Sequence, residues 1–137
     1  MGREDSLTTV PLFSELSRRE LKRCGAVAKV VAFETGDVVA EEGEEGLAFY
    51  VVLGGQAQVK RRGKKVATLI PGDFFGEVSL LDGGPRTATV VAETPLKLLS
   101  ILRWDFRELL EKDPSLVPKI LKELARRLRQ IERPVTA

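Results

Sequence analysis

Histidine is absent from the sequence, and cysteine occurs only once, at Cys24. Histidine is the commonest general base and the commonest metal ligand, so a Ser-His-Asp triad and a Cys/His zinc site are both excluded. A small β-barrel enzyme whose metal ligands are chiefly histidine is disfavoured for the same reason. Carboxylate-only chemistry stays open, but we expect a binding protein with no catalytic residues and no metal site.

Long apolar runs are also lacking. No stretch approaches the roughly 18 apolar residues that suggest a membrane span, and the first ten residues do not have the pattern of a secretory signal. A single cysteine cannot form an internal disulfide and fits a reducing compartment, so we expect a cytoplasmic protein with no membrane partner. The net charge of +2 is too small to indicate direct binding of nucleic acid.

The 137 residues suit a single domain, 1–137, in which composition marks three blocks. Residues 1–28 form an N-terminal helical segment, where Ser17 and Glu20 have the spacing of a capping box. Residues 29–102 hold seven or more short β-rich runs separated by Gly, Pro and Asp, which is typical of a sandwich or barrel. Residues 103–133 form two C-terminal helices, the second restarting at Asp113 and Pro114.

The last of these helices carries apolar residues at heptad spacing, at Val117, Leu121, Leu124, Leu128 and Ile131. This seam fits packing against the chain's own core, and it also fits pairing with a second copy. Leu116 and Ile120 lie beside the seam and suit the core, so the two interpretations are compatible. We expect a homodimer through this helix.

The segment 75–90 combines features that suit a phosphate ester. Gly76 allows close approach to the backbone, and residues 77–81 can form helical turns whose free N–H groups bind an anion. A sharp turn at 83–85 then brings Arg86 back, and its guanidinium offers paired donors to phosphate oxygens. Glu77 would repel a phosphate but suits a sugar hydroxyl. These residues predict a small phosphorylated sugar or nucleotide as ligand.

The order of residues in this segment, F-G-E followed after a short loop by P-R-T-A-T-V, resembles the phosphate-binding cassette of cyclic nucleotide-binding domains. That family includes catabolite activator proteins, kinase regulatory subunits and nucleotide-gated channels. The similarity extends to residues 10–13, which precede the β-rich region, to turn glycines at 36, 43 and 55, and to the two C-terminal helices over 104–128. It implies a mainly β fold with flanking helices: a double-stranded β-helix (a jelly-roll-like β-roll) with an N-terminal helix and two C-terminal helices.

The resemblance also assigns roles at the site. It implies that Glu77 accepts from the ribose 2′-OH, that Arg86 binds the phosphate, and that backbone N–H groups of Ser79, Thr87 and Ala88 complete the cradle beside Gly76. The residues that it places around the purine are Val59, Val66 and Val78. The arginines of the last helix fit a solvated face, and Arg127 among them can instead cap the base. Plainer alternatives remain: Glu77 and Arg86 can pair with each other, and the valines can be ordinary core residues.

The expected ligand is cAMP or cGMP, with no other cofactor. A hydroxyl at Thr87 can accept from the guanine 2-amino group, but bacterial-type domains with Ser or Thr there also take cAMP, which we favour. The expected function is a sensor that moves its C-terminal helix on binding and signals to an unknown effector protein or domain. One alternative is the sensor half of a transcription regulator; the helix-turn-helix that such a regulator needs does not fit between the last helix and Ala137. The other alternative is a degenerate module that binds no nucleotide.

Two charged clusters receive simpler interpretations. Glu41, Glu42, Glu44 and Glu45 lack the alternating ligands of a calcium loop and fit a solvated turn. The basic residues between Lys60 and Lys65 fit a hairpin tip with a glycine turn, where the charges also protect a strand edge.

Overall fold

The computed structural model describes residues 13, 16–76 and 84–131, and within the last helix it leaves out the side chains of residues 123, 124, 127, 128, 130 and 131. The chain divides into two compact units. One is a β-roll over residues 27–106, and the other combines residues up to 26 with those from 107 onward.

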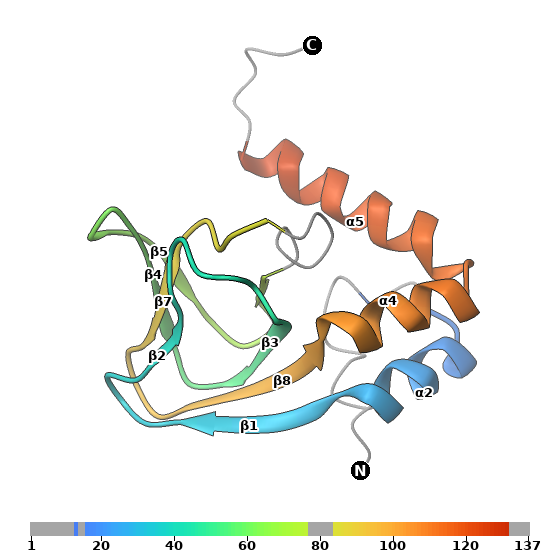
Figure 1. Cartoon of the computed structure of the whole chain (residues 1–137), viewed down its shortest axis with the longest axis horizontal. Coiled ribbons are helices and arrows are strands. Elements are labelled where there is room, and N and C mark those ends of the chain that lie inside the picture. Colours follow the sequence, from blue (N-terminus) through green and yellow to red (C-terminus); the bar gives the residue numbers. More distant parts are fainter. Residues whose placement is uncertain (1–12, 14–15, 77–83, 132–137) are drawn as a thin grey trace. The chain divides into compact units, whose positions relative to one another are not determined.

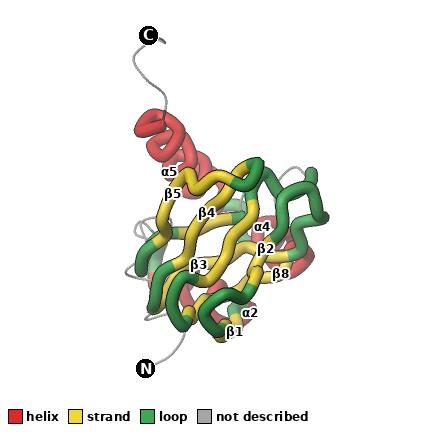
Figure 2. The backbone as a smooth tube through the Cα atoms, turned by 90° about the vertical axis from the view of Figure 1, so that its left-hand side faces the viewer, coloured by secondary structure: helices red, strands yellow, loops and turns green. Residues whose placement is uncertain are grey.

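The β-roll consists of two antiparallel sheets of four strands each (Figure 1). The first sheet has the order β1-β8-β3-β6, and the second has the order β2-β7-β4-β5. Figure 2 shows these strands in yellow, joined by tight loops. The strands are β1 (Lys29–Phe33), β2 (Val38–Ala40), β3 (Ala48–Gly54), β4 (Ala57–Arg61), β5 (Lys64–Leu69), β6 (Phe74–Phe75), β7 (Thr89–Ala92) and β8 (Leu96–Leu102).

Both sheets contribute to one hydrophobic core. Strand β8 is central to the first sheet, where it pairs with β1 from Lys29↔Ser100 to Phe33↔Leu96 and with β3 on its other side. The buried core residues drawn from the two sheets are Ala40, Val52, Ala57, Leu69, Phe75, Val90, Ala92, Leu96 and Leu98. Two antiparallel sheets around a shared core are the jelly-roll arrangement that the resemblance predicted.

The expected turn glycines occupy left-handed backbone conformations. Gly55 shows why the residue is needed: its φ is +83°, and a Cβ there would lie 2.0 Å from the Pro95 carbonyl oxygen. The hairpin between β4 and β5 turns through Arg62 and Gly63, with φ of 53° and 78°. Positive φ at both central residues matches a type I′ turn, which suits the twist of a two-stranded ribbon. The basic cluster is therefore a hairpin tip, as predicted.

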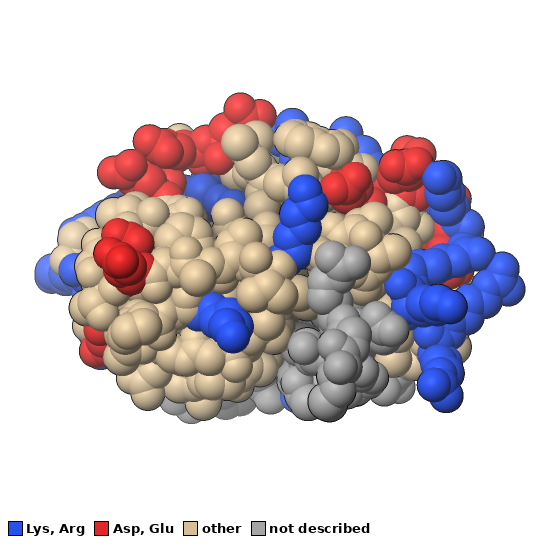
Figure 3. Space-filling view, turned by 90° about the horizontal axis from the view of Figure 1, so that it is seen from below, with Lys and Arg blue, Asp and Glu red and all other residues tan. Residues whose placement is uncertain are grey.

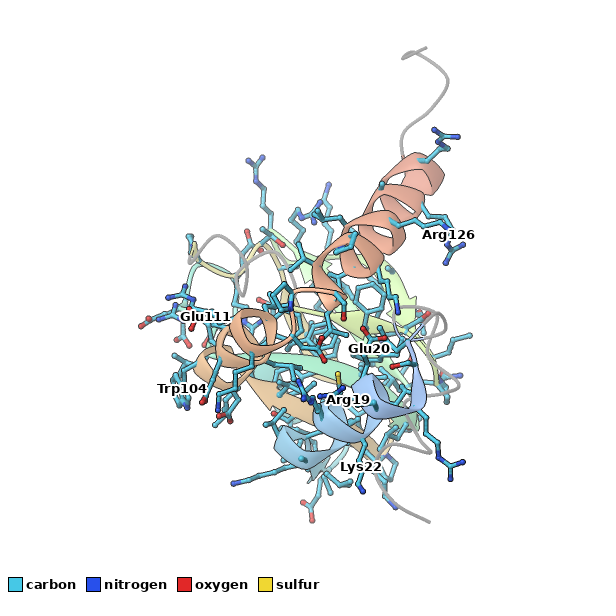
Figure 4. All side chains as sticks on the ribbon, turned by 90° about the vertical axis from the view of Figure 1, so that its right-hand side faces the viewer. Arg19, Glu20, Lys22, Trp104, Glu111 and Arg126 are labelled. Atoms are coloured by element: carbon cyan, nitrogen blue, oxygen red, sulfur yellow. The ribbon has the colours of Figure 1, made fainter. Side chains whose placement is uncertain are left out.

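The helices are α2 (Arg18–Val27), α4 (Arg103–Lys112) and α5 (Leu116–Ile131). The capping box at the start of α2 is confirmed: Ser17 N donates to Glu20 Oε1 at 2.8 Å, and Glu20 N donates to Ser17 Oγ at 3.2 Å. In Figure 4 Glu20 lies on the side of α2 toward the start of α5, with Lys22 on the opposite side. Figure 3 shows Lys and Arg side chains gathered over α2, whose exposed basic residues are Arg18, Arg19 and Lys22.

Glu20 links α2 to α5 within the helical unit. Its side chain is buried and accepts hydrogen bonds from Lys119 Nζ at 2.6 Å and Ser115 Oγ at 2.5 Å. Burial by itself raises the pKa of Glu20, but the hydrogen bonds from Lys119, Ser115 and Ser17 outweigh it and lower the pKa to about 2. This carboxylate is therefore fully engaged by the protein itself.

The last helix differs from the prediction at its start. It begins at Leu116 rather than at Pro114, because residues 113–115 form a tighter turn in which Leu116 N donates to Asp113 O at 3.1 Å. Leu116 and Ile120 are buried, as expected. Val117 and Leu121, the first two residues of the heptad seam, are exposed. The side chains of the other three seam residues, Leu124, Leu128 and Ile131, lie outside the described part of the chain.

Candidate ligand-binding site

The backbone of Arg86 is fixed by the turn that joins β2 to β3. Arg86 N donates to Glu44 O at 2.7 Å, and Gly43 N donates to Arg86 O at 2.9 Å. The neighbouring residues Glu45 and Pro85 form an isolated antiparallel bridge. The start of the segment 84–92 is thus held against a turn more than 40 positions earlier in the sequence, which fixes the direction in which the Arg86 side chain leaves.

The guanidinium of Arg86 is directed into the β-roll. The residue is only 8% exposed, and Nη2 donates to the Ala48 carbonyl oxygen at 2.7 Å. The guanidinium carbon lies 5.8 Å from the centre of the Tyr50 ring, and that ring stacks on Phe75 with centroids 5.1 Å apart. Both of these contacts are with uncharged groups of β3, a backbone carbonyl and an aromatic ring, which orient the cation. The arrangement suits a site for an anion that accepts paired hydrogen bonds.

Gly76 is part of the same arrangement. Its φ is +92°, and a Cβ there would lie 2.4 Å from Arg86 Nη1 and 2.8 Å from the Ala48 carbonyl oxygen. A glycine is therefore required for two reasons, the left-handed backbone and the closeness of the guanidinium. The sequence predicted a close approach at Gly76 by a ligand; in the structure the group that approaches is the side chain of Arg86.

The residues after Arg86 are tied to two loops. Thr87 is exposed and Ala88 is half-buried. The Thr87 carbonyl oxygen accepts from Arg61 Nε at 3.3 Å, which connects the segment to the end of β4. Thr89 Oγ1 accepts from Glu42 N at 2.9 Å, and Glu42 Oε1 accepts from Arg62 N at 2.9 Å. The acidic turn and the basic hairpin thus both contact this segment.

The two valines expected near the base are placed differently. Val59 on β4 is half-buried and packs against the core of the β-roll. Val66 on β5 is 53% exposed. Since Val59 pairs with Ala67 while Lys60 pairs with Lys65, Val66 is the extra residue of a β-bulge. The geometry favours Val59 over Val66 as a residue that lines the interior.

Several predicted site residues lie outside what the structure describes. Glu77, Val78 and Ser79 belong to the undescribed segment 77–83, and the side chain of Arg127 is also not described. Conversely, three residues that contact Arg86 or Thr87 were not predicted as site residues: Ala48, Tyr50 and Arg61. Tyr50 is the one tyrosine of the chain, but nothing local indicates that it faces Arg86. For Arg61, the alternation of side chains along β4 was a sequence signal, because it places Arg61 on the same face as Val59.

The chain's cysteine is not part of this site. Burial raises the pKa of the Cys24 thiol to about 12, and the Glu20 and Asp113 carboxylates contribute in the same direction. Such a thiol is almost wholly protonated at neutral pH and is a poor nucleophile. Among the described residues, no group of three or more Cys, Asp and Glu side chains is arranged to hold a metal ion. Within the same residues, no helix is long and apolar enough to cross a bilayer.

The chain is similar to proteins of two regulatory kinds. It is 42% identical over 119 residues to a cAMP-dependent protein kinase regulatory subunit from Yarrowia lipolytica, covering 80% of this chain and 32% of that protein. It matches the N-terminal domain of a transcriptional regulator from Streptomyces coelicolor A3(2), with a TM-score of 0.79, 35% identity, and coverage of 93% of this chain and 92% of that one. The catabolite activator protein of Thermus thermophilus gives a TM-score of 0.79 at 33% identity, with coverage of 88% and 59%.

The chain spans about a third of the length of the curated kinase regulatory subunit just described. A sequence model of the family described as "Cyclic nucleotide-binding domain" matches residues 30–113. That range contains both sheets and the segment around Arg86. The fold, the buried arginine and these similarities together show that the chain is a member of the cyclic nucleotide-binding domain family.

Proposed function

We propose that the chain binds cAMP in the β-roll and that occupancy of this site is transmitted through the C-terminal helix to an effector. Membership of the family identifies a cyclic nucleotide-binding regulatory domain. The specific ligand, the contacts and the output are proposals. The observation that carries them is the buried guanidinium of Arg86, oriented by the Ala48 carbonyl and the Tyr50 ring.

Arg86 is the proposed phosphate ligand. A cyclic phosphodiester carries one negative charge and presents two exocyclic oxygens, which match the parallel donors of a guanidinium. The site is also preorganised, because backbone hydrogen bonds to Glu44 and Gly43 and the contact to Ala48 hold the arginine without a ligand. Preorganisation raises affinity, since little side-chain freedom remains to be lost on binding.

The remaining contacts follow from the family resemblance. Glu77 is proposed to accept from the ribose 2′-OH, and the N–H groups of Ser79, Thr87 and Ala88 to donate to the phosphate. Val59 is proposed to face the base because it lines the interior of the β-roll. We favour cAMP over cGMP because the kinase regulatory subunit reported above is named for cAMP; the exposed hydroxyl of Thr87 keeps cGMP as the second ligand to test.

The proposed output is a change in the position of α5. Two residues of its apolar seam, Val117 and Leu121, are exposed and are available to a partner, with a second copy of the chain as the proposed one. A ligand moves such a helix only if it binds one of its positions more tightly. We propose a regulatory rather than an enzymatic role in the cytoplasm, supported by the lack of histidine and by the inert Cys24.

A second candidate concerns the effector. The Streptomyces structure is the N-terminal domain of a transcriptional regulator, and this chain covers 92% of that domain. The Thermus protein is a catabolite activator protein. The chain is therefore either a kinase-type regulatory domain or the sensor part of a transcription regulator. Both use the same ligand site, so they differ only in what receives the signal.

Calorimetric titration of the purified chain with cAMP and cGMP tests the proposed function. We expect saturable binding of cAMP with one site per chain, and weaker binding of cGMP. Hydrogen exchange over residues 116–131, measured with and without ligand, tests the output. Absence of binding of both nucleotides at millimolar concentration would make the chain a degenerate, non-binding member of its family, and unchanged exchange in α5 would remove the proposed output.

A further inference from the structure

We propose that Arg61, at the end of β4, is an additional ligand contact whose guanidinium covers the face of the base. Side chains of a strand alternate between its two faces. Ala57 is fully buried and Val59 packs against the core, so Arg61 is the next residue on the same, inward face. The pairing of β4 with β7 runs from Ala57 to Lys60 without a register shift, which keeps this alternation intact. The inference rests on the proposed function.

The side chain of Arg61 is anchored at the ligand segment. Its Nε donates to the carbonyl oxygen of Thr87, the residue that follows the proposed phosphate ligand. The guanidinium thus lies at the backbone of Thr87, while Val59, the residue proposed to face the base, stands two positions earlier on the same strand. The hydroxyl of Thr87 is the group proposed above to contact a guanine base. The hydrogen bond through Nε fixes the plane of the guanidinium and leaves its flat faces for contact.

The surroundings of Arg61 are electrostatically unfavourable without a ligand. Lys64 stands directly opposite it in the β4–β5 register, and Lys60 stands opposite Lys65; like charges directly opposite each other destabilise a sheet. The Oε1 atom of Glu42 accepts from the backbone N–H of Arg62, the residue after Arg61. Within the described ranges, no salt bridge involves Arg61.

Protection of a strand edge explains only part of this charge. Strand β5 lies at the edge of its sheet, so Lys64 and Lys65 serve to prevent pairing with other chains. Strand β4 lies between β7 and β5 and has no open edge to protect. An exposed arginine at the end of an inner strand, on the same face as Ala57 and Val59, needs another explanation, and an electron-rich ligand supplies it.

A guanidinium stacks well on an aromatic ring because it is planar and weakly hydrated. A purine base offers a larger π-face than a pyrimidine, so this contact selects for purine cyclic nucleotides. The phosphate is already assigned to Arg86, which is buried, whereas Arg61 is exposed at the end of its strand. The two arginines thus recognise different parts of one ligand.

The test compares Arg61→Ala with Lys60→Ala, which removes the same charge from the opposite face of β4. Each variant and the parent are titrated with cAMP and, by competition, with a methyl riboside 3′,5′-cyclic phosphate that has no base. We expect Arg61→Ala to bind cAMP about 3- to 30-fold more weakly, Arg61→Lys to fall between it and the parent, and Lys60→Ala to bind like the parent. The base-free ligand should bind the parent and Arg61→Ala equally.

Three outcomes would overturn the inference. Equal cAMP affinity of the parent and Arg61→Ala removes the contact. An equal loss with the base-free ligand assigns Arg61 to the phosphate or to general attraction. An equal loss in Lys60→Ala shows an effect of charge alone. In each of these three outcomes the unaltered protein binds cAMP, so the proposed function is retained. If the unaltered protein binds no nucleotide, both the proposed function and this inference are wrong.

Discussion

Glu20 in the helical unit and Arg86 in the β-roll are both buried charged side chains, exposed by 5% and 8%, but they are held in different ways. The Glu20 carboxylate accepts from Lys119, Ser115 and the backbone of Ser17, so the protein supplies its counter-charge. The Arg86 guanidinium donates to the Ala48 carbonyl, lies near the Tyr50 ring and adjoins Gly76, in the segment proposed to bind the phosphate. The first arrangement connects two helices, and the second lies at the proposed ligand site.

The comparison implies that removing each charge affects a different property. Loss of Glu20 should reduce the stability of the helical unit and leave the β-roll site in place. Loss of Arg86 should reduce ligand affinity and leave the fold in place.

Arg86→Ala should weaken cAMP binding by about 30-fold to several thousand-fold, because removing one partner of a buried charged contact costs roughly 2–5 kcal/mol. Arg86→Lys should recover only part of the affinity, since it keeps the charge and loses the paired donors. Calorimetry measures the affinity, and circular dichroism checks that the fold is retained. If Arg86→Ala binds cAMP or cGMP as tightly as the parent, Arg86 is not the phosphate ligand.

Glu20→Ala should lower the free energy of unfolding by about 2–3 kcal/mol, below the 3–5 kcal/mol typical of a broken buried pair because Lys119 is a third exposed. Denaturant unfolding followed by circular dichroism measures this change. The matched control is Glu108→Gln, which removes an exposed ion pair with Lys112 and should change stability little. Equal stability of Glu20→Ala and the parent would contradict a structural role for Glu20.

How far each of these sites could be predicted depends on how local it is. The capping box at Ser17 and Glu20 was predictable because its two members are three residues apart and their roles are fixed by the geometry of a helix start. The bond from Ser115 to Glu20 joins residues 95 positions apart. No periodicity or spacing encodes which distant side chain completes a buried network, so this part required the structure.

The ligand site shows the same division. The turn glycines and Arg86 were identified from residue type and order, because left-handed turns and phosphate recognition restrict those positions strongly. Two features could not be seen in the sequence. Strand β6 has only two residues, which show no alternation, and the bulge in β5 that leaves Val66 exposed is not encoded in a recognisable pattern. A bulge shifts every side chain beyond it, and the sequence carries no clear sign of one here.

Gly76→Ala should weaken cAMP binding by about tenfold, because strain of 1–3 kcal/mol at a left-handed position combines with displacement of the guanidinium. Gly36→Ala is the matched control: φ is +91° at Gly36 and +92° at Gly76, but a Cβ at Gly36 meets nothing within 4 Å. The Gly36→Ala variant should be less stable than the parent but should bind cAMP with the same affinity. Parallel titrations and unfolding curves separate the two effects. Equal losses of affinity in both variants would mean that Gly76 acts through backbone strain alone.

Tyr50→Leu should weaken binding by about 3- to 10-fold, because the guanidinium of Arg86 loses the ring near which it is held. Tyr50→Phe keeps the ring and its stacking on Phe75 and should bind like the parent. Stopped-flow measurement of a fluorescent cAMP analogue gives the association and dissociation rates separately. A loss of similar size in Tyr50→Phe would show that the hydroxyl matters rather than the ring.

The prediction most specific to the ionisation of Glu20 concerns acid. Its pKa in the folded chain, about 2, lies below the ordinary value of 4.5, so the folded state binds this proton more weakly than the unfolded state. The contribution of Glu20 to stability is therefore complete above about pH 5 and is lost as the pH falls from 4.5 toward 2. The gap in unfolding free energy between the parent and Glu20→Gln should be constant from pH 7 to about pH 5 and then narrow. Unfolding curves across this range measure the gap, with Glu108→Gln again as the exposed control. A gap that keeps its size down to pH 2 would mean that Glu20 is not the ionised centre of the network with Lys119 and Ser115.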